Sequence, residues 1–116
     1  MIRNIFNGCL KKRVFEMDTD FIRKWLAFQF VGNMQIDNYG TVWEFDHCIP
    51  LKNFDLTNAF AYEIANNWRN IRPAFVKDNN KKGGKFLMHL IQKQRDLVNQ
   101  FNEDKNSNEN YWRNAL

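Results

Sequence analysis

Residues 42 to 48 alternate between apolar and polar side chains, and this pattern constrains the fold more than any other in the chain. Trp43, Phe45 and His47 share one face of the run, whereas Glu44 and Asp46 share the other. Period-two alternation predicts a β-strand. The run ends in an adjacent aspartate and histidine, which places a hard oxygen ligand beside a titratable base.

A second short strand is predicted over residues 71 to 76, broken at Pro73. Pro50 ends the pairing capacity of the first strand, because proline has no amide hydrogen to donate to a neighbouring strand. Apolar residues at helical spacing predict four helices, over residues 2 to 10, 20 to 30, 57 to 68 and 85 to 102. Strands and helices together predict an α+β fold.

The expected helix boundaries follow from capping residues. Thr57 is the predicted N-cap of the helix over residues 57 to 68. Asp78 is predicted to cap a further short helix that starts near Asn79, and the Gly83-Gly84 pair is expected to interrupt it.

The end of the chain is predicted to be a polar tail over residues 103 to 116. Residues 102 to 110 contain few apolar side chains, so a mobile stretch is predicted there. Tyr111 and Trp112 are unusual in such a tail and predict that its end docks onto the rest of the molecule.

Composition limits the remaining classes. A length of 116 residues fits one domain, and a hydrophobic content of 44% excludes a disordered chain. The net charge of +4 favours a polyanionic partner without requiring one. Two cysteines without a CxxC pair support neither a disulfide framework nor a four-cysteine zinc site. With no signal peptide and no apolar run of ~20 residues, a soluble intracellular protein is expected, not a secreted one.

Two asparagines follow the aspartate–histidine pair. Asn70 and Asn79 lie nine residues apart and offer neutral oxygen and amide groups. A carboxylate, an imidazole and amide oxygens are the parts needed for one-metal phosphodiester cleavage, in which a cation holds the phosphate and the imidazole deprotonates water.

These pieces, in this order, resemble the HNH endonucleases, and the similarity covers roughly residues 20 to 86. The subgroup that the chain looks like consists of small proteins from phages, large DNA viruses and mobile elements. The resemblance implies a compact ββα-metal core over about residues 40 to 85, with flanking helices. The motif segments are Trp43-Glu44-Phe45-Asp46-His47-Cys48-Ile49-Pro50-Leu51, Asn70-Ile71-Arg72-Pro73 and Asp78-Asn79-Asn80-Lys81-Lys82.

The resemblance also implies a role for each site residue. His47 would be the general base that activates water, and Asn70 would hold the loop and orient that base. Asp46 and Asn79 would bind the metal ion, with Asn80 as the rival ligand to Asn79. Hard oxygen donors suit Mg²⁺ or Mn²⁺. The second histidine of the chain, His89, lies outside the motif and is expected to be structural or exposed.

A dense set of basic residues surrounds the motif and predicts contact with the phosphate backbone of double-stranded DNA. No recognition element is visible, so weakly specific or structure-directed nicking is expected. A catalytically silent DNA-binding protein that keeps an HNH shell is one alternative. The basic residues are Arg69, Arg72, Lys77, Lys81, Lys82 and Lys85.

An apolar stripe runs along residues 85 to 101 and has to be buried. Packing against the helix over residues 20 to 30 within one chain is the simpler expectation. A homodimer through this helix is the other. A partner-recruitment module that uses the stripe together with Tyr111 and Trp112 is a further functional alternative. The stripe consists of Phe86, Leu87, Leu90, Ile91, Leu97, Val98 and Phe101.

Overall fold

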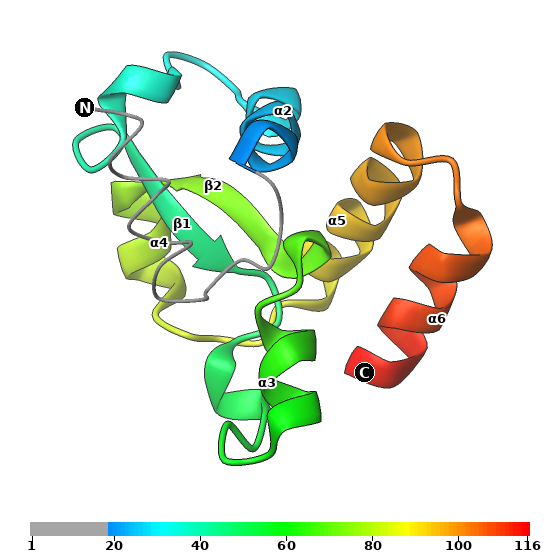
Figure 1. Ribbon diagram of the computed structural model, residues 1–116. Coiled ribbons are helices and arrows are strands. Elements are labelled where there is room, and N and C mark those ends of the chain that lie inside the picture. The colour runs from blue at the N-terminus through cyan, green and yellow to red at the C-terminus, as the bar shows by residue number, and fades with distance from the viewer. Residues whose placement is uncertain (1–18) are drawn as a thin grey trace.

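The computed structural model describes residues 19–116, and a two-stranded sheet lies between helices in it (Figure 1). The helix predicted over residues 2 to 10 lies outside the described residues. Within the described part of the chain, the elements make a compact α+β arrangement, which confirms the predicted class. No helix in that part is both long enough and apolar enough to cross a membrane.

The sheet pairs β1 (Trp43–His47) with β2 (Ile71–Phe75) in antiparallel register. Trp43 lies opposite Phe75, and His47 lies opposite Ile71. Pro73 sits inside β2 opposite Phe45, so the predicted break at this residue is wrong. A proline is tolerated here because each strand of a two-stranded sheet has an outer edge that needs no amide donor.

Helix α4 (Val76–Lys82) follows β2 directly and contacts both strands. The helix begins three residues earlier than predicted, so Asp78 lies in its first turn and does not cap it. Gly83 ends α4 in a left-handed conformation with φ 54°, which glycine adopts without steric cost. The two strands and α4 therefore pack together, although residues 48–70 separate the strands in the sequence.

Helix α2 (Thr19–Gln29) agrees with the predicted helix and covers the sheet from one side. Trp25 is fully buried, and its indole Nε1 donates hydrogen bonds to the carbonyl oxygens of Trp68 (2.7 Å) and Ile71 (3.0 Å). These bonds tie α2 to the start of β2. Three short 3₁₀ turns connect the elements, η1 (Ile36–Asn38), η2 (Leu51–Asn53) and η3 (Trp68–Asn70).

Helix α3 (Ala59–Ala65) is shorter than the predicted helix over residues 57 to 68. Asn58, and not Thr57, caps it, because the Asn58 side chain accepts a hydrogen bond from the amide of Ala61 at 3.0 Å. The Thr57 hydroxyl instead donates to Asp55, which fixes the turn before the helix.

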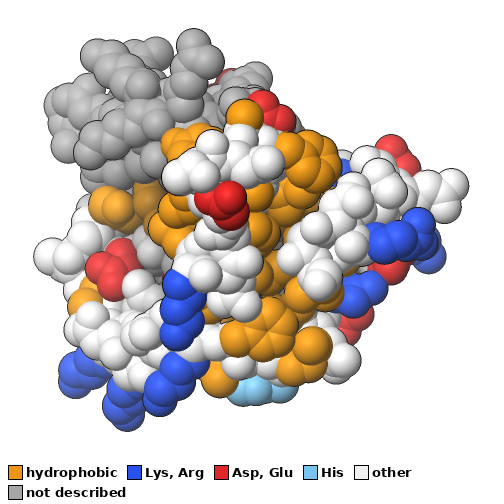
Figure 2. All heavy atoms as spheres, turned by 90° about the horizontal axis from the view of Figure 1, so that it is seen from below, with side chains coloured by type: hydrophobic (Ala, Val, Ile, Leu, Met, Phe, Trp, Pro, Cys, Tyr) orange, Lys and Arg blue, Asp and Glu red, His pale blue; other side chains and the backbone are white. Residues whose placement is uncertain are grey.

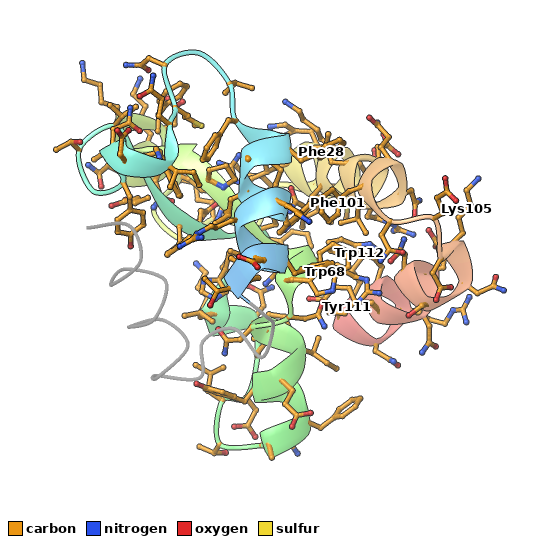
Figure 3. All side chains as sticks on the ribbon, turned by 45° about the horizontal axis from the view of Figure 1, so that its top comes forward. Phe28, Trp68, Phe101, Lys105, Tyr111 and Trp112 are labelled. Carbon is orange, nitrogen blue, oxygen red and sulfur yellow. The ribbon has the colours of Figure 1, made fainter. Side chains whose placement is uncertain are left out.

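The predicted mobile stretch at residues 102 to 110 is wrong, because α6 (Lys105–Ala115) occupies most of it. Asp104 caps this helix, and Asn108 is fully buried. The predicted docking of the aromatic pair is confirmed, since Tyr111 and Trp112 are both buried and point inward (Figure 3). Because most residues of α6 are polar, the spacing of apolar residues in the sequence did not predict this helix.

Helix α5 (Met88–Phe101) packs against α2 within the same chain, which confirms the simpler of the two expectations. The ring of Phe101 lies 5.1 Å from that of Trp25 and 5.3 Å from that of Phe28, measured between centroids. Ile91 and Val98 are fully buried. The predicted stripe begins too early, because Phe86 precedes the helix and is 40% exposed.

Candidate functional site

The end of β1 and the middle of α4 form one wall each of a shallow hollow of about 340 Å³. The predicted residues Asp46, His47 and Asn79 all line it. Asp46 and His47 are the last two residues of β1, where the strand ends, and α4 adds Asn79 to the same hollow. The complete lining is Phe45, Asp46, His47, Pro50, Leu51, Lys52, Asn79, Lys82 and Gly84.

Asp46 is only 7% exposed and is paired with two cations. Its Oδ2 accepts from Arg72 Nε at 2.9 Å, and its Oδ1 accepts from Lys82 Nζ at 3.1 Å. Lys82 is itself 6% exposed, and its ammonium also donates to the carbonyl oxygen of His47 at 3.0 Å. The carboxylate is therefore held rigidly, and each of its oxygens keeps further acceptor capacity.

The imidazole of His47 has a fixed orientation. Its Nε2 lies 2.9 Å from Oδ1 of Asn66, and Nδ2 of Asn66 donates to the carbonyl oxygen of Tyr62 at 3.1 Å. The second bond sets the direction of the amide, because a carbonyl only accepts. Asn66 Oδ1 must then accept from the ring, so Nε2 carries the proton and Nδ1 carries the free lone pair.

The environment of His47 also favours its neutral form. Burial lowers the pKa of the imidazole below its usual 6.5, and the hydrogen bond to Asn66 and the charge of Asp46 offset this only in part. At neutral pH the ring is therefore mostly an uncharged base. The next residue, Cys48, is fully buried, and burial raises the pKa of its thiol to about 12, which makes it a poor nucleophile.

Asn70 lies close to His47 in the fold but does not contact its ring. Its fully buried side chain accepts from the amide of Ile49 at 2.7 Å and donates to the carbonyl oxygens of Ile49 (3.1 Å) and Ala65 (2.9 Å). These bonds hold the segment after His47, and the predicted role of Asn70 in catalysis stays a prediction. The contact that orients the ring comes from Asn66, which sequence reasoning missed.

The positions of their side chains distinguish Asn79 from Asn80 as candidate metal ligands. Asn79 donates through Nδ2 to Oε1 of Glu44 at 2.7 Å, which leaves its Oδ1 without a hydrogen bond among the described residues. Asn80 is exposed and does not line the hollow. Glu44 shares a face of β1 with Asp46, so the strand alternation was the signal that could have pointed to it.

The predicted basic residues fall into separate groups. Lys77, Lys81 and Lys85 are exposed, and Figure 2 shows lysine and arginine side chains gathered along one edge of a face. Lys81 and Lys85 also line a second hollow of about 300 Å³, together with Arg72, Lys82 and His89. That hollow adjoins the first through Lys82.

Arg69 does not belong to this basic surface. Its Nε donates to Oδ1 of Asn108 at 2.8 Å, and its guanidinium carbon lies 4.6 Å from the ring centroid of Trp68. Burial lowers the pKa of the guanidinium, which nonetheless stays charged at neutral pH. Arg69 therefore anchors α6, and its predicted role as a phosphate contact does not fit its position.

The donors around the first hollow suit a hard cation. Asp46 offers a carboxylate and Asn79 an amide oxygen, and the described residues contain no cluster of three or more His, Cys, Asp or Glu side chains that would favour a protein-only metal cage. Mg²⁺ is typically held by one or two carboxylates together with substrate phosphates and water. Because Arg72 and Lys82 offset the charge of Asp46, an ion would depend on a bound phosphate for much of its affinity.

Comparison with known proteins finds two viral relatives. The chain is 39% identical over 90 residues to the uncharacterized protein L426 of Acanthamoeba polyphaga mimivirus, a match that covers 78% of this chain and 40% of the relative. It is 36% identical over 75 residues to the uncharacterized protein L246 of the same virus, covering 62% of this chain and 33% of the relative. No family model and no solved structure matches. The chain is thus similar to part of two longer mimivirus proteins.

Proposed function

We propose that the protein is a metal-dependent HNH endonuclease of the ββα-metal type that nicks double-stranded DNA. The observation that carries the proposal is the bond between His47 Nε2 and Asn66 Oδ1, which leaves Nδ1 as the basic atom of a histidine that lines the same hollow as Asp46 and Asn79. The order of β1, β2 and α4 supports the same fold type. A half-buried, oriented base in the same hollow as two hard oxygen donors has no evident use in binding alone.

In the proposed reaction, His47 Nδ1 takes a proton from a water molecule as its oxygen attacks the phosphorus. The bond from phosphorus to the 3′ oxygen breaks, the leaving oxygen takes a proton from a solvent water molecule, and the products are a 5′-phosphate and a 3′-hydroxyl. A Mg²⁺ or Mn²⁺ ion held by Asp46 and Asn79 would stabilise the charge that develops on the phosphate and the leaving oxygen. Asn66 keeps the ring in the tautomer that can accept this proton.

Arg72 and Lys82 position the metal-binding carboxylate in this proposal. Each of them fixes one oxygen of Asp46, and Lys82 also ties α4 to the backbone of His47. Lys77, Lys81 and Lys85 lie exposed nearby and would attract phosphates without reading the sequence. One site of this kind cuts one strand in each encounter.

A specific observation favours a second function, a DNA-binding protein that does not cut. A carboxylate already paired with two cations is a weaker metal ligand than a free one. The third candidate, a partner-recruitment module, loses its basis, because Ile91, Val98, Tyr111 and Trp112 are buried within the chain.

Supercoiled-plasmid cleavage separates cutting from binding. The plasmid is incubated with the protein in Mg²⁺, Mn²⁺, Zn²⁺ or EDTA, and binding is followed in parallel by gel shift. We expect conversion to open circles with Mg²⁺ and Mn²⁺, little with Zn²⁺ and none in EDTA. Binding without any nicking in all four conditions would establish the silent alternative.

A further inference from the structure

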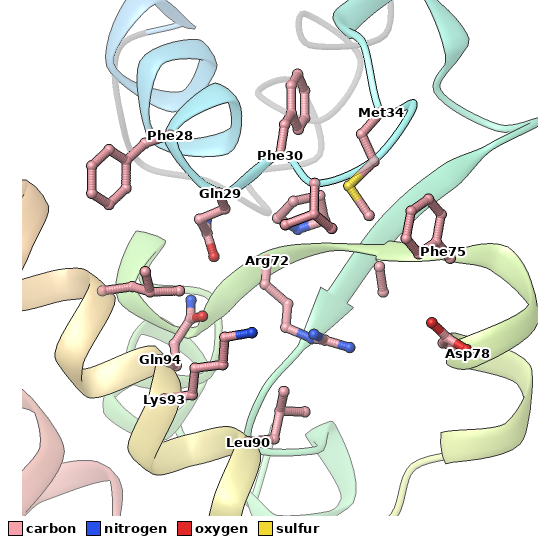
Figure 4. Close-up of a pocket in the computed structure, with 14 residues that line it drawn as sticks. Phe28, Gln29, Phe30, Met34, Arg72, Phe75, Asp78, Leu90, Lys93 and Gln94 are labelled. Atoms are coloured by element: carbon pink, nitrogen blue, oxygen red, sulfur yellow. The ribbon is translucent and has the colours of Figure 1, made fainter.

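A third cavity, of about 310 Å³, lies beside the outer edge of β2, between the end of α2 and α5 (Figure 4). Its walls combine aromatic and aliphatic side chains with several amide and charged groups. A volume of this size, with apolar surfaces and convergent polar groups, is typical of a small-ligand site. The apolar walls include Phe28, Phe30, Met34, Pro73, Phe75 and Leu97.

Two buried glutamines offer unused acceptors to this cavity. Gln29 is 9% exposed and Gln94 is 2% exposed, and both line the space. Each donates through its Nε2, Gln29 to Trp25 and Ile71 and Gln94 to Arg69 and Ile71, always to a backbone carbonyl oxygen. These bonds fix the direction of both amides, because a carbonyl only accepts.

The Oε1 atoms of both glutamines consequently face away from the backbone, and neither forms a hydrogen bond among the described residues. Neither oxygen is among the fully enclosed unpartnered atoms of that part of the chain, so each remains accessible. In Figure 4 the oxygen of Gln29 points into the space between α2, β2 and α5. Two accessible acceptors beside aromatic walls favour a ligand that has both N–H donors and an apolar face.

Charged groups complete the polar part of the cavity. Arg72 and Lys93 supply donors, and Asp78 supplies a third acceptor. Arg72 also reaches the first site, since its Nε lies 2.9 Å from Asp46 Oδ2. The cavity shares Arg72, Asp78 and Leu90 with the basic hollow that Lys81 and Lys85 line, so a phosphate-binding surface adjoins it.

We propose that this cavity binds one unpaired nucleobase of the DNA substrate. This inference rests on the proposed function, because it names the DNA structure that the nuclease would recognise. A base has a flat apolar face for the aromatic rings and an edge that carries both N–H donors and acceptors. The phosphates on either side of the unpaired base lie in the basic hollow. The protein therefore recognises DNA with a bulge, flap or mismatch in preference to a fully paired duplex.

The test compares three short DNA duplexes of equal length in EDTA, so that binding is read without cleavage. One is fully paired, one has a single unpaired adenine, and one has an unpaired abasic residue in the same place. The two bulged duplexes carry the same number of phosphate charges and differ in the presence of the unpaired base. Fluorescence anisotropy gives the dissociation constant of each.

We expect the wild type to bind the adenine bulge roughly tenfold more tightly than the abasic bulge, because stacking of one base on aromatic side chains typically contributes an affinity of this order. Val31→Trp fills the cavity from its mouth, since Val31 lines it and is 54% exposed, and this variant should bring the ratio of the two constants close to one. Lys93→Ala, at an exposed position, should lower the same ratio. Leu56→Trp, at a residue 43% exposed outside the cavity, is the matched control and should keep the wild-type ratio.

Equal affinity of the wild type for the adenine and abasic bulges would overturn the proposal, as would a preference that persists in both Val31→Trp and Lys93→Ala. Adenosine monophosphate, titrated alone, distinguishes a free nucleotide from a base in DNA. If it binds as tightly as the adenine-bulged duplex, the assignment to DNA is overturned. Plasmid nicking is a separate readout, so a protein that nicks without any base preference would refute this inference alone.

Discussion

Replacing Asn66 with aspartate gives the sharpest prediction about the proposed base. The substitution places a carboxylate where the amide oxygen lies 2.9 Å from His47 Nε2. The negative charge stabilises the imidazolium and raises its pKa. An opposite charge at this range typically changes a pKa by ~1–3, so the pKa of the largely buried ring should rise by at least about one.

The expected effect on the nicking rate follows from the rise in the pKa of His47. In the wild type, burial lowers the pKa of His47 below 6.5, so the nicking rate should fall only as the pH drops below 6.5. In Asn66→Asp the imidazole stays protonated to a higher pH. The acidic limb of the profile of nicking rate against pH therefore moves to a higher pH. The rate near pH 6 should drop roughly tenfold for each pH unit by which the limb moves, while the rate well above the new pKa should be close to that of the wild type.

The assay is the initial rate of plasmid nicking at saturating Mg²⁺ between pH 5 and pH 9, at constant ionic strength. Asn67→Asp is the matched control, because it adds the same charge at the adjacent residue, whose side chain bonds Arg69 and not the ring. Asn66→Ala removes a hydrogen bond that raises the pKa of His47, so its acidic limb should move downward. An acidic limb that is the same in Asn66→Asp and the wild type would refute the reasoning.

Three further outcomes are expected. Asn79→Ala should raise the Mg²⁺ concentration needed for half-maximal nicking, whereas Asn80→Ala should leave it unchanged, because only Asn79 lines the hollow; the reverse order would place the ligand one residue later. Asn70→Ala removes three buried hydrogen bonds and should lower the free energy of unfolding in urea by about 2–4 kcal/mol; a loss below about 1 kcal/mol would argue against its holding role. Trp112→Ala should cost about 3–5 kcal/mol in the same measurement, because the side chain is 1% exposed, and an unchanged midpoint would mean that α6 is not part of the core.

The parts of the fold that sequence patterns predicted are those that local chemistry determines. Strand β1 follows from an alternation within seven residues, and α2 follows from apolar residues at helical spacing. The hollow at the end of β1 could be anticipated because Asp46 and His47 are adjacent in the sequence. These features need no knowledge of distant contacts.

The parts that sequence patterns missed depend on contacts between distant segments. Nothing local distinguishes Asn66 from Asn67, and only the packing of α3 brings Asn66 to the ring of His47. Helix α6 has too few apolar residues to be recognised, and Tyr111 and Trp112, together with the part-buried hydrogen bond between Arg69 and Asn108, attach it to the core. Polar residues that pack through mutual hydrogen bonds produce no periodic pattern of apolar residues in the sequence, so the pattern does not predict their helix.

The most direct test of the central claim compares DNA cleavage and DNA binding for His47→Ala. The base acts on the water only in the transition state, so its loss should lower the nicking rate in Mg²⁺ by ~10²–10⁴-fold and leave the dissociation constant for the duplex nearly unchanged. His89→Ala is the control, since this exposed histidine does not line the hollow at the end of β1. The account predicts a folded, DNA-binding and inactive His47→Ala protein beside an active His89→Ala protein. Nicking at the wild-type rate by folded His47→Ala would contradict it.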